Sequence, residues 1–172
     1  MRKMIKRVRE MAPKDYRTTT KIGVVLLRLT MGWMMFYAGI TKVLNPEWTA
    51  AGFLERAVTL RDFFLWFASP EVLPVTNFLN AWGLTVIGAC LILGLFVRAS
   101  AIAAILMMLL YYLPLPLLYP DAHSFIVDDH VIYIAGFVLL AGISAGRFLG
   151  LDAWVRKQRV VSKNSFRRGF IG

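Results

Sequence analysis

The sequence has a single cysteine, two histidines and only ten acidic residues. One cysteine cannot form an internal disulfide. Cys90 lies within an apolar run, where a packing role is favoured over a reactive thiol, which needs solvent access and a stabilised thiolate. There is no Gly-rich phosphate loop, and serine and histidine are not arranged as in a hydrolase. The sequence therefore argues against the common nucleotide-binding and hydrolytic enzymes.

Long hydrophobic runs are the dominant feature of the chain. Hydrophobic residues make up 58% of its 172 residues. A membrane-spanning helix needs roughly 20 consecutive apolar residues. The run at 22–44 meets this requirement and stops at Asn45-Pro46, because proline cannot continue a helix. This run predicts a first transmembrane span.

The next apolar stretch is too long for one crossing and contains a single charge, Arg98. A reversal at Arg98 divides it into spans at 76–97 and 99–118, and a further run predicts a fourth span at 127–148. The third span contains two prolines near its end, and we expect them to bend or unwind it there. Four crossings are thus predicted.

The net charge of +10 is concentrated at the two ends of the chain. Lysine and arginine excess marks the cytoplasmic side of a membrane protein. We therefore predict a multi-pass protein of the cell membrane, with a basic cytoplasmic arm at 1–21, a transmembrane domain at 22–150 and a basic cytoplasmic tail at 151–172. The partner is then the lipid bilayer. A nucleic-acid partner is not expected, because no basic patch is interleaved with base-stacking aromatic residues.

The connection at 46–74 has its own helical pattern. Its apolar residues recur at helical spacing, with charged residues off that stripe: Phe53, Leu54, Ala57, Leu60, Phe64 and Phe67. This pattern is typical of an amphipathic helix at the membrane interface, and a lid over a substrate is the alternative. The predicted fold class is all-α: an integral membrane four-helix bundle with an extra amphipathic interfacial helix between spans one and two.

Two cations lie on one face of the first span. Arg28, Gly32, Gly39 and Lys42 are spaced so that they share this face. The glycines allow a neighbouring helix to come close. Arg28 and Lys42 either extend to opposite headgroup layers or face an internal cavity and hold an anion or a quinone carbonyl.

The fourth span has a similar stripe of Asp129, Tyr133, Gly136 and Arg147. We expect Asp129 near Lys42, where the two would form either a structural ion pair or part of a site. Arg147 and Arg98 are expected at the opposite end, near Arg28.

The titratable cluster of the chain lies around the two histidines, with His123 and Asp121 before the fourth span and Asp128, Asp129 and His130 at its start. Imidazole exchanges protons near neutral pH, as a quinol site requires. An ordinary polar loop with a helix cap is the alternative. No metal site is predicted, because no tight ligand spacing is present.

Three segments together resemble the DoxX/DoxD family of small four-helix membrane proteins: LLRLTMGWMMFYAGITKVL (26–44), GLTVIGACLILGLFVRASA (83–101) and DDHVIYIAGFVLLAGISAGRFLGLDAW (128–154). The DoxD member is described as a subunit of thiosulfate:quinone oxidoreductase. The resemblance points to these positions: Arg28, Gly32, Gly39, Lys42, Gly94, Arg98, Asp129, His130, Gly146, Arg147 and Asp152.

Two functions follow as hypotheses. The first is a quinone-linked oxidoreductase subunit acting on thiosulfate or another small sulfur compound, with quinone as the cofactor. Its expected catalytic residues are His130, Asp129 and Lys42. Its expected substrate- and quinone-binding residues are Arg28, Lys42, Tyr133, Arg98 and Arg147, and its expected helix-packing residues are Gly32, Gly39, Gly94 and Gly136. The second is a non-catalytic accessory subunit bound to other membrane subunits or to copies of itself. A proton-coupled transporter is disfavoured, because no carboxylate lies mid-span.

Overall fold

The computed structural model describes residues 14–116, 126–143 and 145–152. Within these ranges the chain is helical and contains no strand, which confirms the all-α prediction. The elements are α2 (Lys14–Val43), α3 (Ala51–Glu55), α4 (Arg61–Phe67), α5 (Leu73–Leu93), α6 (Val97–Tyr112), α7 (Asp129–Gly142) and the 3-10 turn η1 (Ala145–Arg147). Among the described residues, α2 (from Thr18) and α5 are long and apolar enough to cross a membrane, and α6 and α7 are shorter apolar helices.

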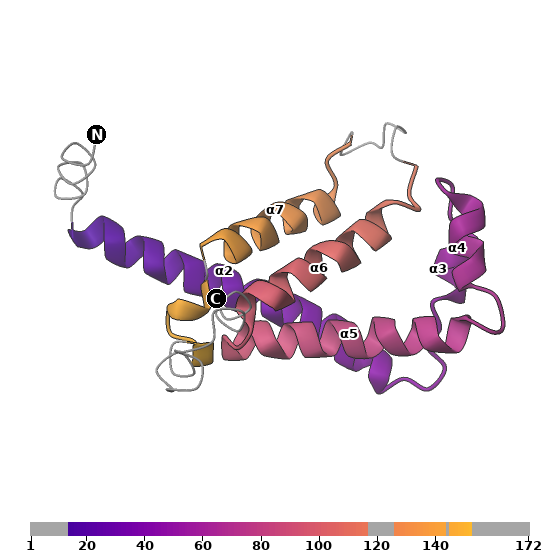
Figure 1. The fold of residues 1–172 in the computed structure, drawn as a ribbon, viewed down its shortest axis with the longest axis horizontal. Coiled ribbons are helices and arrows are strands. Elements are labelled where there is room, and N and C mark those ends of the chain that lie inside the picture. Colours follow the sequence, from indigo (N-terminus) through magenta and orange to yellow (C-terminus); the bar gives the residue numbers. More distant parts are fainter. Residues whose placement is uncertain (1–13, 117–125, 144, 153–172) are drawn as a thin grey trace, which may run out of the picture.

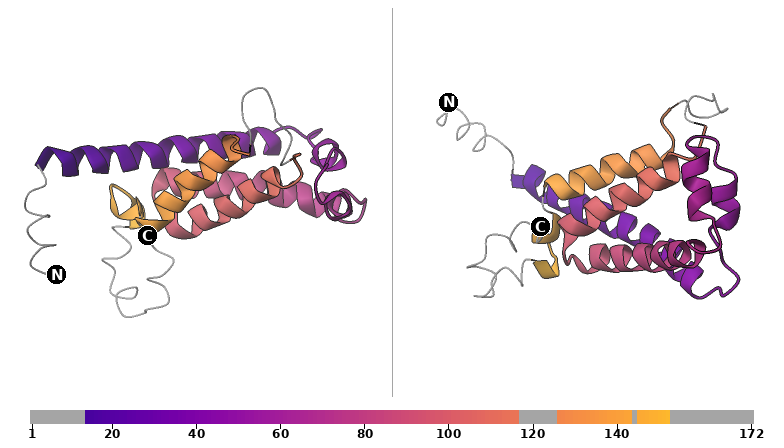
Figure 2. Two further views of the ribbon diagram at one scale, coloured as in Figure 1. Left: turned by 90° about the horizontal axis from the view of Figure 1, so that it is seen from above. Right: turned by 45° about the vertical axis from the view of Figure 1, so that its right-hand side comes forward.

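The four long helices pack as two pairs. Helix α2 runs along α5, and α6 runs along α7 (Figure 1). A tight turn joins α5 to α6, and the two helices diverge from it, so that α3 and α4 lie across the wide end (Figures 1 and 2). We call this the α3–α4 end. The start of α7 also lies there, whereas η1 lies beside the α5–α6 turn at the opposite end.

Glycines set the close approach of α2 and α5. A Cβ atom at Gly39 would overlap the backbone nitrogen of Thr85, and one at Gly88 would overlap the backbone of Phe36. These two helices can therefore touch backbone to backbone only where side chains are absent. Gly32 lies on the same seam, where an added Cβ would lie 3.0 Å from the Cβ of Leu91.

Two other predicted packing glycines lie elsewhere. A Cβ at Gly136 would meet the sulfur of Met31 at 2.7 Å, so this residue brings α7 against α2. Gly94 ends α5 instead of lining a helix face: its φ is +67°, a left-handed conformation that favours glycine. All four long helices contribute mostly apolar side chains to a main core, including Met35, Leu84, Leu91, Val97, Ala101, Phe137 and Leu140.

The helix boundaries differ from the predicted spans. The fourth span ends at Gly142, earlier than predicted, and the chain continues into η1. Arg98 lies in the first turn of α6 and not at the reversal, which is made by residues 94–96. As the two prolines predict, the third span stops being helical early, at Tyr112. Helix α2 begins at Lys14, inside the predicted arm.

The single amphipathic helix predicted in the 46–74 connection is wrong, since α3 and α4 are separate. The backbone amides of Val58 and Thr59 donate to the carbonyl of Pro114, at 2.8 and 3.3 Å, instead of continuing a helix. Leu60 then takes a left-handed φ of 52° before α4 begins. Much of the predicted stripe nevertheless points inward, because Leu54, Ala57 and Phe64 form a second small core with Ala50.

Candidate functional site

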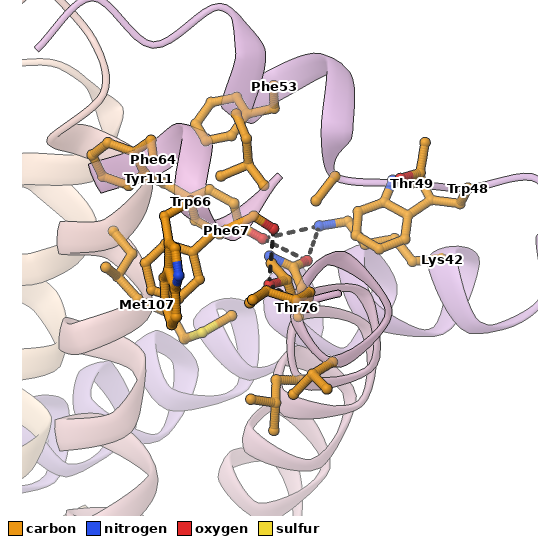
Figure 3. A pocket seen from close by; sticks show the side chains of 17 residues that line it. Lys42, Trp48, Thr49, Phe53, Phe64, Trp66, Phe67, Thr76, Met107 and Tyr111 are labelled. Carbon is orange, nitrogen blue, oxygen red and sulfur yellow. Dashed lines mark hydrogen bonds between the residues drawn. The ribbon is translucent and has the colours of Figure 1, made fainter. Parts of the chain in front are cut away.

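A cavity of about 470 Å³ lies at the α3–α4 end of the bundle (Figure 3). This volume is within the usual range of small-molecule sites, roughly 300–1,000 Å³. Its wall is mainly aromatic and aliphatic: Trp48, Ala50, Phe53, Leu54, Phe64, Trp66, Phe67, Val72, Val75, Leu79, Met107 and Leu110. The polar lining residues are Lys42, Thr49, Thr76, Asn80 and Tyr111. An apolar cavity with a few convergent polar groups is the usual form of a ligand site.

Three helices contribute one polar side chain each to the centre of this cavity. Lys42 comes from the last turn of α2, Asn80 from α5 and Tyr111 from the last turn of α6. The Lys42 Nζ donates to Asn80 Oδ1 at 2.8 Å and to the Tyr111 hydroxyl at 3.0 Å. The Tyr111 hydroxyl donates to the same Asn80 oxygen at 2.8 Å, which closes a triangle (Figure 3). We call these three residues the Lys42 triad.

Aromatic rings surround the charge of Lys42. Its Nζ lies 4.7 Å from the centroid of the Trp48 ring and 5.3 Å from that of Tyr111, within the range of cation–π attraction. No carboxylate pairs with Lys42 in the described ranges, where the ion pair present joins His130 to Asp128. An ammonium group has three protons, and two are used in the triad. One proton of Lys42 is thus not used in the triad, and the charge faces the aromatic rings.

His130 and Asp128 form a pair close to the triad. His130 Nδ1 lies 2.6 Å from Asp128 Oδ2, and the two side chains are 29% and 26% exposed. Asp128 also caps α7, since its Oδ1 accepts from the backbone amide of Val131 at 3.2 Å. The His130 ring lies 6.1 Å from the Tyr111 ring, centroid to centroid. The predicted helix cap is therefore confirmed at Asp128, whereas proton exchange at His130 stays a prediction.

The expected Asp129–Lys42 ion pair does not form. Asp129 is exposed in the first turn of α7, and Lys42 bonds to Asn80 and Tyr111 instead. The carboxylate beside His130 is that of Asp128. His123 and Asp121 of the predicted cluster lie outside the described residues.

Arg28 lies far from this cavity and is used differently. It is 2% exposed. Its Nη1 donates to the carbonyls of Ala145 and Phe148 at 3.1 and 2.8 Å, and its Nη2 donates to that of Leu149 at 3.0 Å. The hypothesis that Arg28 holds an anion or a quinone carbonyl does not fit this geometry, because the guanidinium is already bonded to the backbone that follows α7.

The same backbone segment is fixed to the α5–α6 turn by Asp152. This fully buried carboxylate accepts from the amides of Phe96 and Val97 at 2.8 and 3.1 Å, so it caps α6. Its own amide donates to Gly94 at 2.9 Å. We call Arg28, Asp152 and the residues between 145 and 152 the clasp. The clasp lies within the segment 128–154 that resembles the DoxX/DoxD family.

The other predicted binding residues do not line the cavity. Tyr133 packs partly buried against the main core, and Arg98 is exposed at the start of α6. Arg147 lies in η1. No group of three potential metal ligands occurs among the residues that the structure describes.

Sequence reasoning found Lys42 but missed its partners. Asn80 and Tyr111 each lie on another helix, and Trp48 lies in the 46–74 connection, which was predicted as an interfacial helix. The signal available was Asn80 itself, an amide within the apolar run that begins at residue 76. A polar side chain in such a position requires a partner, and here the partner is a lysine.

Comparison with known proteins gives one match. The model of the DoxX family matches residues 23–114, which is more than half of the chain and includes the whole Lys42 triad. No curated protein and no solved structure matches the sequence. The chain therefore belongs to the DoxX family of membrane proteins.

Proposed function

We propose that this protein crosses the cell membrane four times and binds a quinone at the Lys42 triad, as a subunit in the quinone-linked oxidation of thiosulfate or another small sulfur compound. The carrying observation is the lysine with an unused proton and an unpaired charge in an aromatic cavity. A quinone matches this cavity chemically, because its flat ring suits aromatic walls and its carbonyl oxygens accept hydrogen bonds.

The outer surface of the bundle supports the membrane assignment. Each long helix exposes large apolar side chains: Trp33 is 59% exposed on α2, Phe78 60% on α5, Leu106 58% on α6 and Ile132 59% on α7. Soluble monomers rarely expose broad apolar patches, whereas lipid accommodates them. The excess of lysine and arginine at the chain ends supports a cytoplasmic location for both termini, and with this orientation the cavity lies toward the outer leaflet.

The two shorter helices are compatible with four crossings. Because the two prolines of the third span end α6, backbone carbonyls beyond it have no partner within that helix. An unpaired carbonyl is costly at membrane depth. Here the turn between α3 and α4 supplies the donors: Pro114 accepts from the backbone amides of Val58 and Thr59, and Leu115 accepts from the Thr59 hydroxyl at 2.8 Å. The irregular backbone is thus bonded within the protein, as membrane-embedded loops must be.

The redox chemistry balances with quinone as the oxidant. Two thiosulfate ions joined by a new S–S bond release two electrons, and these electrons with two protons convert the quinone to the quinol. The Lys42 ammonium stabilises negative charge that develops on a quinone oxygen. The partly exposed His130–Asp128 pair beside Tyr111 is suited to carry protons between the solvent and the site.

The test uses the full-length protein in lipid nanodiscs. Lys42→Met removes the charge and retains much of the apolar side chain, and Lys21→Met, at an exposed position on the same helix, is the matched control. We expect Lys42→Met to weaken quinone binding at least tenfold and to abolish thiosulfate-dependent quinone reduction. Unchanged quinone affinity in Lys42→Met would refute the proposal.

The clasp favours a second candidate, a non-catalytic accessory subunit. The resemblance had pointed to Arg28, Gly94 and Asp152 as family positions. All three make contacts that hold the end of the bundle together, which fits a structural role. Alanine at Lys42 and at His130 separates the two functions. Lost turnover with intact assembly supports the quinone site, whereas lost assembly supports the accessory role.

A further inference from the structure

The cavity has a polar side and an apolar side. In Figure 3, Lys42, Trp48 and Thr49 lie on one side, and Trp66 and Met107 lie on the other. Thr49 is exposed and accepts a hydrogen bond from Asn77 at 3.2 Å, so the polar side borders the loop before α3. A ligand held here is therefore oriented, with its polar group toward Lys42.

The apolar side is open. Several residues line the cavity and are also exposed on the outer surface: Val75 at 57%, Leu79 at 60%, Leu110 at 43% and Trp66 at 59%. Val75 and Leu79 are one turn apart on α5, and Leu110 lies on α6. The exposed part of the cavity wall is thus contributed by α5, α6 and α4, and α5 and α6 diverge toward this end of the bundle (Figure 1). We call these four residues the apolar mouth.

We propose that the apolar mouth is a lateral opening to the lipid, through which the site takes long-chain amphiphilic quinones whose hydrocarbon tail stays in the mouth. This inference rests on the proposed quinone function and adds the substrate class and the route of access. A water-soluble quinone without a tail lacks the part that the mouth holds.

A long-chain quinone has a hydrocarbon tail and a polar ring, and the two parts exchange different environments when the quinone enters the site. A hydrocarbon tail that moves from lipid to the mouth exchanges one apolar environment for another, at little cost. The quinone ring gains the unused proton of Lys42 and the aromatic walls. Access from water would instead require a long-chain quinone to leave the bilayer and expose its hydrocarbon tail to water, which costs free energy for each CH₂ group exposed.

The first test maps the tail. A quinone with a photoreactive diazirine at the end of a ten-carbon chain is irradiated with the full-length protein in phosphatidylcholine nanodiscs. We expect cross-links in α5 near Val75 and Leu79 and in α6 near Leu110, competed by unlabelled long-chain quinone and lost in Lys42→Met. Competed cross-links that map instead to the Thr49 loop, or to the outer face of α2, would overturn the inference.

The second test uses a substitution that narrows the apolar mouth. Leu79→Trp adds bulk at the opening, and Val86→Trp is the matched control, since Val86 is 54% exposed on the same helix and does not line the cavity. We expect Leu79→Trp to slow Lys42-dependent cross-linking of the long-chain quinone at least tenfold and Val86→Trp to leave it unchanged. Equal rates in the two variants would overturn the lateral route.

The two proposals fail in different ways. If Lys42→Met binds quinone as well as the wild type, the quinone function itself is wrong. If Lys42→Met loses quinone binding while the tail maps away from α5 and α6, the quinone function stands and the lateral mouth is wrong.

Discussion

Replacing Arg28 by methionine tests whether the clasp holds the end of the bundle together. The substitution retains an unbranched side chain and removes three hydrogen bonds of 2.8–3.1 Å to the backbone. The Ala145 carbonyl keeps a partner, because it also accepts from the amide of Phe148 at 3.2 Å. The Phe148 and Leu149 carbonyls lose their guanidinium partner, and the Asp152 carboxylate loses a nearby positive charge.

The magnitude follows from these losses. Leaving a buried polar group unpaired costs about 1–3 kcal/mol, and these two carbonyls are only partly buried, so together they account for about 2 kcal/mol. Part of this cost is offset, because Arg28→Met removes a buried charge. It also removes the buried Nε, which has no hydrogen-bond partner in the wild type. Breaking a buried charged contact typically costs about 3–5 kcal/mol. We therefore expect a loss of that size, or a fall in Tm of about 6–20 °C for a chain of this length.

The assay is reversible unfolding in mixed micelles, followed by circular dichroism. Arg98→Met is the matched control, because Arg98 is an exposed arginine near the same end of the bundle. Arg28→Lys should fall between the wild type and Arg28→Met, since one ammonium cannot bond all three carbonyls in the same fork geometry. Equal unfolding free energies for Arg28→Met and Arg98→Met would refute the structural role of the clasp.

Two further substitutions test the packing of the helices and the cap. Gly88→Ala should cost about 1–3 kcal/mol in the same unfolding assay, because its Cβ would meet the backbone of α2; Gly83→Ala, with nothing within 4 Å, should be nearly neutral, and equal costs would contradict the seam. Asp152→Asn keeps one acceptor oxygen of two, so the Phe96 or Val97 amide should exchange hydrogen faster while distant amides of α7 do not change.

The helices were predictable because lipid imposes a simple requirement. Each span needs a long apolar run, and proline and charge mark where such runs stop, as at Asn45-Pro46 and Pro114. Boundaries were less predictable. Gly94, and not Arg98, makes the reversal, since the left-handed backbone that ends α5 suits glycine.

The connection before α5 shows why helical spacing alone misled. Its apolar residues recur every three or four positions, which fits one continuous helix. The competing interaction comes from a distant part of the chain: Pro114 has a carbonyl without a helical partner, and the amides of Val58 and Thr59 bond to it. A contact between such distant residues leaves no periodic signal in the sequence. Sequence alone therefore predicted one continuous amphipathic helix where the structure has two short helices, α3 and α4, whose residues line the cavity.

The two cations of α2 show what separates a structural residue from a binding residue. They share a helix face and lie 14 positions apart, about 21 Å along the axis. At one end, the chain returns after 117 residues with backbone carbonyls that occupy Arg28. At the other, Lys42 meets one amide oxygen, one hydroxyl and aromatic faces, which leave a proton unused. The difference lies in the supply of acceptors around each charge, and this is why the cavity at Lys42, and not the clasp at Arg28, is the place to look for a ligand.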